Sequence, residues 1–271
     1  GHGTEGPDKR TAPSHPNAKV REASGADDWR AAVREQFKRG ADLIKLASHF
    51  SAEEIAAAVD EAHKLGLKVT VDAETFYIDM AIAAGVDCVE HPLPRSDKAI
   101  RLMAKHNICS DTTIVSYLYL LDRWGGYYGS TSRRFTLTKD TVFEMAKKLK
   151  QANITMGIGT DLILDWFRDL PEPYITELKQ FVALGYSIPE VLSIATKTNA
   201  DILGIGDKLG TLAAGKLADI IVIDGKPDKN LNDLVKVSMV IRDGKVAVEN
   251  GQVVIPRHVS KSVSVSKSDK K

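Results

Sequence analysis

Three apolar segments of this sequence end in side chains that could bind a metal ion or transfer a proton. Lys45 lies near the end of the first segment, His91 ends the second, and Asp161 directly follows the third. The carboxyl ends of parallel strands meet at one rim of a β/α barrel, and the active sites of such barrels lie at that rim. A lysine, a histidine and an aspartate gathered there are the ingredients of a metal-assisted hydrolase.

Each of these residues also has an ordinary structural explanation when it is taken alone. Burying an unpaired ammonium group is costly, so Lys45 should either pair with a carboxylate or react with carbon dioxide to form a carbamate. His91 could be a hydrogen-bonded structural residue, and Asp161 could cap the helix that follows it. Because all three residues occur in order on alternating strands, the joint pattern favours the interpretation as metal ligands.

The elements that must position these residues alternate between strands and helices. Strands are expected at residues 41–48, 68–73, 86–91, 108–114 and 154–160, and helices at about 27–39, 51–64, 76–84, 96–106, 138–151 and 172–185. Strands separated by helices of this length indicate parallel β/α units. We count about five such strands, whereas a closed barrel of this kind has eight.

Local signals mark the ends of several elements. Ser51 and Glu54 form a capping box at the start of one helix, and Gly66 follows that helix as its expected stop. Residues 115–137 are rich in aromatic side chains and contain glycine, which predicts a long loop. Loops at this rim carry substrate specificity, so Tyr117 is a candidate substrate contact. The alternative is that the aromatic side chains simply pack the loop down.

The pattern of apolar and turn-forming residues changes after Gly204. Short apolar runs are separated by the turn signals Asp243-Gly244 and Asn250-Gly251, which predict antiparallel hairpins. We therefore predict three parts: a partial (β/α) barrel hydrolase domain at residues 1–206, a composite β-sandwich module at 207–257 and a disordered tail at 258–271.

Composition excludes several classes of function. The chain has 271 residues and a net charge of +1, and no basic stripe recurs, so nucleic-acid binding is not expected. No apolar run approaches the roughly 18 residues that cross a bilayer, so no membrane association is expected. Cys88 and Cys109 lie in expected buried strands. Two reduced thiols indicate a cytoplasmic location, with a disulfide between neighbouring strands as the alternative.

The order of motifs resembles the amidohydrolase superfamily, in its imidazolonepropionase/prolidase-like branch. The matching segments are Ile44-Lys45, Val89-Glu90-His91 and the Gly-Ile-Gly-Thr-Asp run that ends at Asp161. Residues 195–219 carry a second, longer signature, which in that family marks the passage from the last barrel helix into a β-sandwich. The resemblance implies an α/β fold, a (β/α)8 TIM barrel of which this chain contains roughly strands 4–8, with a small C-terminal β-sandwich module.

The resemblance also implies roles for the matching residues. A carbamylated Lys45 would bridge two divalent metals, and His91 would bind the second of them. Asp161 would bind the first metal and act as the general base. The expected metal is zinc, as one or two ions, with manganese or iron as alternatives.

Two departures from the family pattern concern the metal site. No His-x-His pair occurs in the sequence, so the chain is expected to begin after the third barrel strand. Asp72 stands where the family has a strand-5 histidine. Asp72 and Glu74 alternate along one strand and should point the same way, which makes Asp72 a fourth candidate ligand and Glu74 a candidate substrate contact. A lost or altered second metal site is the alternative.

The sequence therefore predicts a metal-dependent hydrolase that acts on carbon–nitrogen bonds of small amides, cyclic amides or dipeptide-like substrates. One alternative is a non-catalytic relative that has lost its metals. Another is a chain that requires a complementary N-terminal segment, supplying strands 1–3, from a partner chain. A homo-oligomer would also be ordinary for this class.

Overall fold

The computed structural model describes residues 21–255, except residues 48, 74, 125–136 and 163–165. Its larger part is a parallel sheet with strand order β1-β2-β3-β4-β5. The strands are β1 (Leu43–Ala47), β2 (Lys68–Asp72), β3 (Cys88–Glu90), β4 (Cys109–Asp111) and β5 (Met156–Gly157). The predicted α/β class with parallel strands is confirmed. In the described residues β1 and β5 form the two edges of this sheet, so closure into a barrel remains a prediction.

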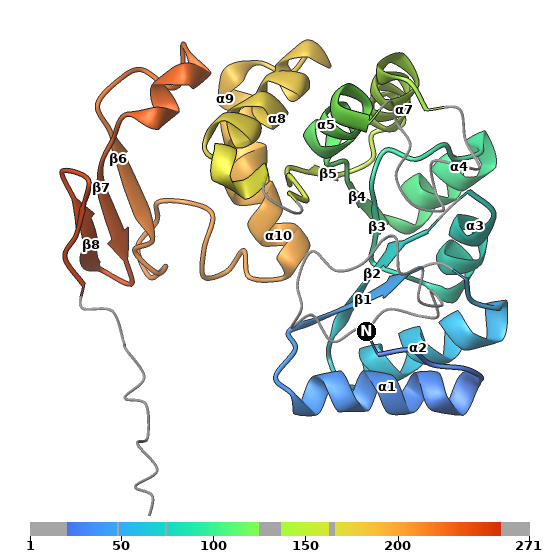
Figure 1. The fold of residues 1–271 in the computed structure, drawn as a ribbon. Helices are drawn as coiled ribbons and strands as arrows, with labels where there is room; N and C mark the ends of the chain where they lie inside the picture. Colours follow the sequence, from blue (N-terminus) through green and yellow to red (C-terminus); the bar gives the residue numbers. More distant parts are fainter. Residues whose placement is uncertain (1–20, 48, 74, 125–136, 163–165, 256–271) are drawn as a thin grey trace, which may run out of the picture.

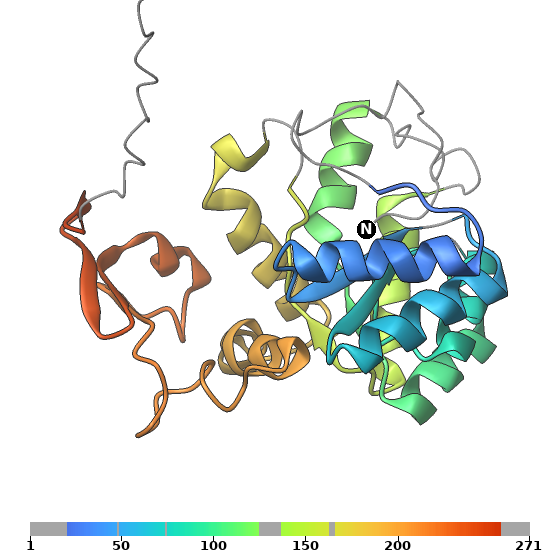
Figure 2. The same ribbon diagram turned by 90° about the horizontal axis from the view of Figure 1, so that it is seen from below.

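Most helices lie along the outer face of the curved sheet (Figures 1 and 2). The α-helices of the described residues are α1 (Ala26–Lys38), α2 (Ala52–Lys64), α3 (Thr75–Ala84), α4 (Asp97–His106), α5 (Ile114–Trp124), α7 (Lys139–Gln151), α8 (Glu172–Ala183), α9 (Ile188–Ser193) and α10 (Asn199–Leu203). The capping box predicted at Ser51 and Glu54 is present at the start of α2. Gly66, which has a φ of 76°, follows that helix.

The core lies between the sheet and these helices. Ile44, Leu46, Val69, Val71 and Val89 alternate along β1 to β3 and are almost wholly buried in one cluster with helix side chains. Their alternation leaves the residues between them on the inner face of the sheet. The register therefore places Lys45, Asp72, Glu90 and Asp111 on that inner face, near the carboxyl ends of their strands.

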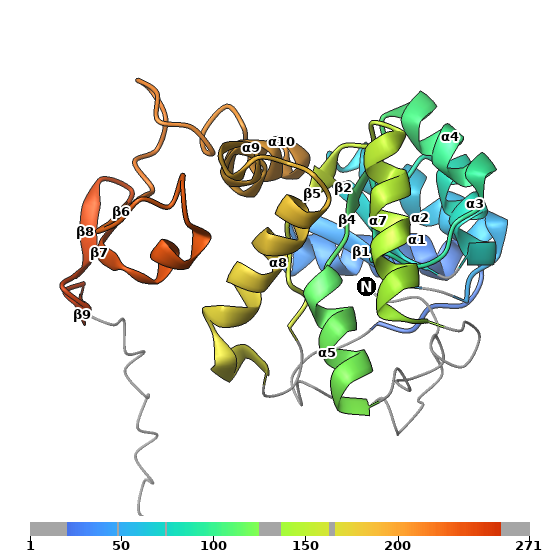
Figure 3. The same cartoon turned by 90° about the horizontal axis from the view of Figure 1, so that it is seen from above.

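The C-terminal part is an antiparallel sheet with strand order β6-β7-β8-β9 (Figure 3). Its strands are β6 (Ile220–Ile223), β7 (Val237–Arg242), β8 (Lys245–Glu249) and β9 (Gln252–Val253), and a 3-10 helix (Leu231–Val235) precedes β7. Both predicted hairpin turns are present, with positive φ at Asp243-Gly244 and Asn250-Gly251. The antiparallel module agrees with the prediction. The three-part division of the chain stays a prediction, and the tail at 258–271 lies outside the described residues.

One element was predicted wrongly. Residues 115–124, expected to begin a long loop, belong to helix α5. Ile114, Val115, Leu118 and Leu121 recur at helical spacing and pack against the core, so tertiary burial decides the local structure over the β-prone aromatic residues between them. The remainder of that expected loop, at 125–136, lies outside the described residues.

Two smaller expectations can also be compared with the structure. Cys88 and Cys109 pair in register on β3 and β4 and are both free and buried, and their reduced state stays a prediction. Among the described residues, no helix is both long and apolar enough to span a membrane.

Candidate active site

Four predicted residues come together at the carboxyl ends of the parallel strands. Asp72 lies between the two basic groups: its Oδ2 is 3.5 Å from Lys45 Nζ and 3.2 Å from His91 Nε2. Asp161 approaches from the segment after β5, with its Oδ2 4.0 Å from His91 Nε2. Side chains from β1, β2, β3 and the end of β5 therefore converge on one point. Glu74 lies outside the described residues.

Backbone geometry and three partners fix the position of His91. Its φ is 64°, so the chain turns sharply where β3 ends and aims the ring toward Asp72. His91 Nδ1 lies 2.8 Å from the hydroxyl of Thr113. Arg95 donates to the backbone carbonyl of His91, and the Tyr117 ring lies 5.6 Å from the imidazole. One ring nitrogen is thus anchored, while Nε2 is left facing the carboxylates.

The carboxylates control the charge of both basic residues. Burial disfavours the charged form of Lys45, but Asp72, Asp161 and Glu90 outweigh it and raise the pKa of the lysine. Burial likewise opposes the charge on His91, and Asp72 and Asp161 again raise its pKa. The surrounding acids therefore favour the protonated forms of both basic groups.

Two further acids of the site, Glu90 and Asp111, were not predicted from the sequence. They lie side by side in the register of β3 and β4. Burial, together with the neighbouring charge of Glu90, raises the pKa of Asp111 to about 6, and its Oδ1 atom is buried without a hydrogen-bond partner. A signal was present, because β4 ends in the polar run Cys-Ser-Asp-Thr-Thr, as the other strands end in polar residues.

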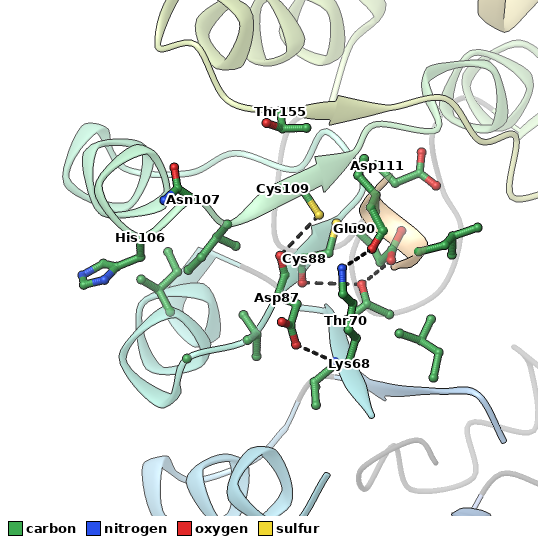
Figure 4. Close-up of a pocket in the computed structure, with 18 of the residues that line it drawn as sticks. Lys68, Thr70, Asp87, Cys88, Glu90, His106, Asn107, Cys109, Asp111 and Thr155 are labelled. Atoms are coloured by element: carbon green, nitrogen blue, oxygen red, sulfur yellow. Dashed lines mark hydrogen bonds between the residues drawn. The ribbon is translucent and has the colours of Figure 1, made fainter. Parts of the chain in front are cut away.

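These acids also line a cavity of about 820 Å³ on the inner face of the sheet (Figure 4). Thr70, Cys88, Glu90, Cys109 and Asp111 all line this cavity. Thr70 donates a hydrogen bond to Glu90. The lining also includes Lys68, Asp87 and Thr155 at the amino ends of the strands, so the cavity extends from those ends along the inner face. Glu90 and Asp111 line the cavity near the carboxyl ends, whereas none of the four predicted residues is among its described lining residues.

Gly159 permits the close approach of Asp111 to the segment after β5. A Cβ atom added at Gly159 would lie 2.9 Å from Asp111 Oδ1 and nearer still to Oδ2. We expect Gly159→Ala to displace the carboxyl group and to lower the free energy of unfolding by about 1–3 kcal/mol, measured by urea denaturation. The cost should shrink in an Asp111→Ala background, and equal costs in the two backgrounds would contradict this explanation.

Asp161 also has an unusual backbone conformation, with a φ of 45°. The buried Ser116 of α5 holds this conformation, because its hydroxyl donates to the carbonyl oxygens of Thr160 and of Asp161, the latter at 2.8 Å. The carboxylate itself is 42% exposed. The backbone of Asp161 is therefore anchored while its side chain remains free to reach a substrate.

A fully buried acid, Glu177 of α8, lies behind the site. Its carboxyl oxygens accept hydrogen bonds from the amides of Ile114 at 3.1 Å and Val115 at 2.6 Å. Burial raises the pKa of Glu177 to about 8, and the two amide hydrogen bonds oppose this rise without cancelling it.

The raised pKa of Glu177 predicts a dependence of stability on pH. Its folded-state pKa lies above the ordinary value of 4.5, so the folded state binds the proton more tightly than the unfolded state. The free energy of unfolding should therefore fall as pH rises from about 4.5 to 8, by at most about 1.4 kcal/mol per pH unit from this group. Urea denaturation across this range should show a flatter dependence for Glu177→Gln. Parallel curves would contradict the prediction.

The residue types at the site fit a divalent metal, but their arrangement is incomplete. One imidazole and several carboxylates are suitable donors for such an ion, and the site carries more carboxylates than cationic groups. The unpartnered Oδ1 of Asp111 is a further sign of a missing positive charge. Within the described part of the chain, however, no group of three or more His, Cys, Asp or Glu side chains is arranged so that it could hold a metal ion.

Comparison with known proteins establishes the family. Residues 9–247 match the amidohydrolase family, and the chain belongs to that family. An imidazolonepropionase of Streptococcus gordonii is 25% identical over 212 residues, which cover 76% of this chain and 62% of the relative. Ochratoxinase of Aspergillus niger is 26% identical over 224 residues, which cover 76% of this chain and 45% of the relative.

The fold is likewise similar to solved structures. A crystal structure of a Xaa-Pro dipeptidase with bound methionine matches with a TM-score of 0.74 and 25% identity, covering 85% of this chain and 63% of that one. The chain spans less than two thirds of the length of each of these three relatives. Members of the amidohydrolase family generally use divalent metals.

Proposed function

We propose that this protein is a metal-dependent hydrolase that cleaves carbon–nitrogen bonds in small amides, cyclic amides or dipeptide-like substrates. The observation that carries the proposal is the convergence of Asp72, His91 and Asp161, from three separate strands, on one point at the rim. Relatives named as an imidazolonepropionase, an ochratoxinase and a Xaa-Pro dipeptidase support the same class of reaction.

Asp161 is the proposed general base. Its exposed carboxylate takes a proton from the water that attacks the scissile carbonyl and then passes the proton to the nitrogen as the carbon–nitrogen bond breaks. Thr113 holds the His91 ring in place during these steps. Tyr117, which lies against His91, and Glu74 are the proposed substrate contacts.

The proposed ligands of the metal are His91, Asp161, Asp72 and Lys45, the last as its carbamate. A zinc ion held there would supply a Lewis acid that polarises the scissile carbonyl and lowers the pKa of the attacking water. A carbamate at Lys45 would be anionic and would face the carboxylates of Asp72, Asp161 and Glu90, so cations must accompany its formation.

One observation favours a second candidate, a non-catalytic member of the family. Asp72 pairs directly with the ammonium group of Lys45 and with His91, so the acids and bases of the site can neutralise one another without a metal. In such a protein Lys45 stays unmodified and no metal binds.

Metal analysis separates the two candidates. The purified chain is loaded with zinc and bicarbonate, dialysed and examined by plasma mass spectrometry, and His91→Asn is compared with the exposed control His106→Asn. About one or two equivalents of zinc, lost in His91→Asn and kept in His106→Asn, together with turnover of a panel of amides and dipeptides, support the hydrolase. An unmodified Lys45 and no bound metal under all conditions would instead favour the non-catalytic protein.

A further inference from the structure

The hydroxyl of Thr113 lies against His91, although Thr113 directly precedes a helix. Helix α5 begins directly after Thr113, and a threonine in this position normally accepts a hydrogen bond from an amide in the first turn of the helix. Among the described residues no such bond is present, and Thr113 Oγ1 instead lies 2.8 Å from His91 Nδ1. The first amides of α5 therefore need another acceptor, because buried amides without one cost about 1–3 kcal/mol each.

Glu177 supplies that acceptor from a different helix. Its carboxyl group, wholly buried on α8, accepts from the amides of Ile114 and Val115. These residues are 63 and 62 positions away in the sequence. Thr113 itself has a φ of 41°, not the extended backbone of an ordinary N-cap residue, so Glu177 performs the capping task at this end of α5.

The first turn of α5, whose amides donate to Glu177, lies against both His91 and Asp161. Thr113 and Tyr117 lie against the ring of His91. Ser116 donates to the backbone carbonyl of Asp161. A shift of this single turn would therefore move the His91 ring and the Asp161 backbone together.

We propose that Glu177 is a positioning residue for the active site: it caps α5 from α8 and so fixes the turn in which Thr113 contacts His91 and Ser116 contacts Asp161. The inference rests on the proposed function, because Asp161 is the base of that reaction. Glu177 touches none of the reacting groups, and its effect passes through the first turn of α5.

A purely structural role is the alternative, in which Glu177 only joins α5 to α8. The substitution Glu177→Gln separates these roles. Glutamine has the same shape but a single acceptor oxygen, so it can accept from at most one of the two backbone amides. Its side-chain NH2 group is a donor and would face the other backbone N–H, which is also a donor. The matched control is Glu172→Gln, an exposed acid in the first turn of the same helix.

The measurements report the surroundings of His91 and Asp161 as well as the free energy of unfolding. Nuclear magnetic resonance of the folded chain reports the ring nitrogens of His91 and the backbone amide of Asp161. We expect Glu177→Gln to shift both signals, whereas Glu172→Gln leaves them as in the unsubstituted chain. With an amide substrate, kcat should fall by about ten- to a hundredfold in Glu177→Gln while KM stays close to its original value, because a misplaced base affects the chemical step.

Each outcome supports or overturns the role of Glu177 as a positioning residue. If Glu177→Gln lowers the free energy of unfolding but leaves the His91 and Asp161 signals in place, Glu177 only joins two helices and the inference is wrong. If Glu177→Gln does not fold, Ser116→Ala takes its place, since it breaks the same connection at the other end. An unshifted Asp161 signal in Ser116→Ala overturns the inference. If the unsubstituted chain shows neither metal binding nor turnover, the proposed function fails, and the spectra still decide the role of Glu177.

Discussion

Replacing Asp161 by asparagine is expected to lower the rate of hydrolysis by about 10²- to 10⁴-fold, the range found when a general acid–base group is lost. Asparagine has nearly the same shape as aspartate but cannot take a proton. The backbone anchor from Ser116 to the carbonyl of Asp161 does not involve the side chain, so it should survive the substitution. The loss should therefore appear in kcat with little change in folding.

The measurement compares initial rates and urea denaturation for the unsubstituted chain and the variant. Asp243→Asn is the matched control, because it makes the same chemical change at an exposed turn where positive φ suits asparagine. The free energy of unfolding should change by no more than about 0.5 kcal/mol at either position. Retained turnover in Asp161→Asn would show that another group moves the proton.

Replacing Arg95 by methionine is expected to cost about 2–4 kcal/mol of stability, more than any other single change considered for the site. Arg95 is 4% exposed, and burial lowers the pKa of its guanidinium to about 10. It donates to the carbonyl oxygens of Glu90, at 3.1 Å, and of His91, and to the hydroxyl of Ser110 at 3.1 Å. Methionine fills similar volume but leaves these buried acceptors without a donor.

Urea denaturation of Arg95→Met checks this prediction, with Arg101→Met on the exposed face of α4 as the control. The control should change the free energy of unfolding by less than about 0.5 kcal/mol. Because Arg95 holds the backbone of His91 in its turn, the variant should also weaken binding of the proposed metal. Equal stability of the two variants would mean that the carbonyl groups at the end of β3 find other partners.

Most elements of the fold were predictable because their signals are local. The capping box at Ser51 and Glu54, the glycine at residue 66 and the two Asx-Gly turns each depend on side chains within a few residues of one another. The apolar runs of the five parallel strands are recognisable for the same reason. Helix α5 was not predicted, because its aromatic residues suggested a loop. The burial of Ile114 and Val115, which favours the helix, exists only in the folded chain.

Some residues of the candidate site were also predictable from the sequence, and others were not. Lys45, His91 and Asp161 could be named in advance, because each lies at or near the end of a recognisable strand and strand ends meet at one rim. Asp72 could be named because it stands where the resembled family has a histidine. Asp111 was overlooked although β4 ends in a polar run like the others. The register that sets it beside Glu90 is a contact between strands, which no local pattern contains.

The sequence by itself determined most of the order of strands and helices, the membership of the amidohydrolase family and four candidate side chains near the ends of its strands. These properties depend on residue type, spacing and order along the chain. The tertiary structure alone decided that Asp72 pairs with Lys45 and His91, that Arg95 supports the turn at His91, and that Glu177 caps a helix 62 residues earlier in the chain. These contacts depend on how distant helices and strands pack, because a buried charge or amide takes whichever partner the folded chain brings within hydrogen-bonding distance.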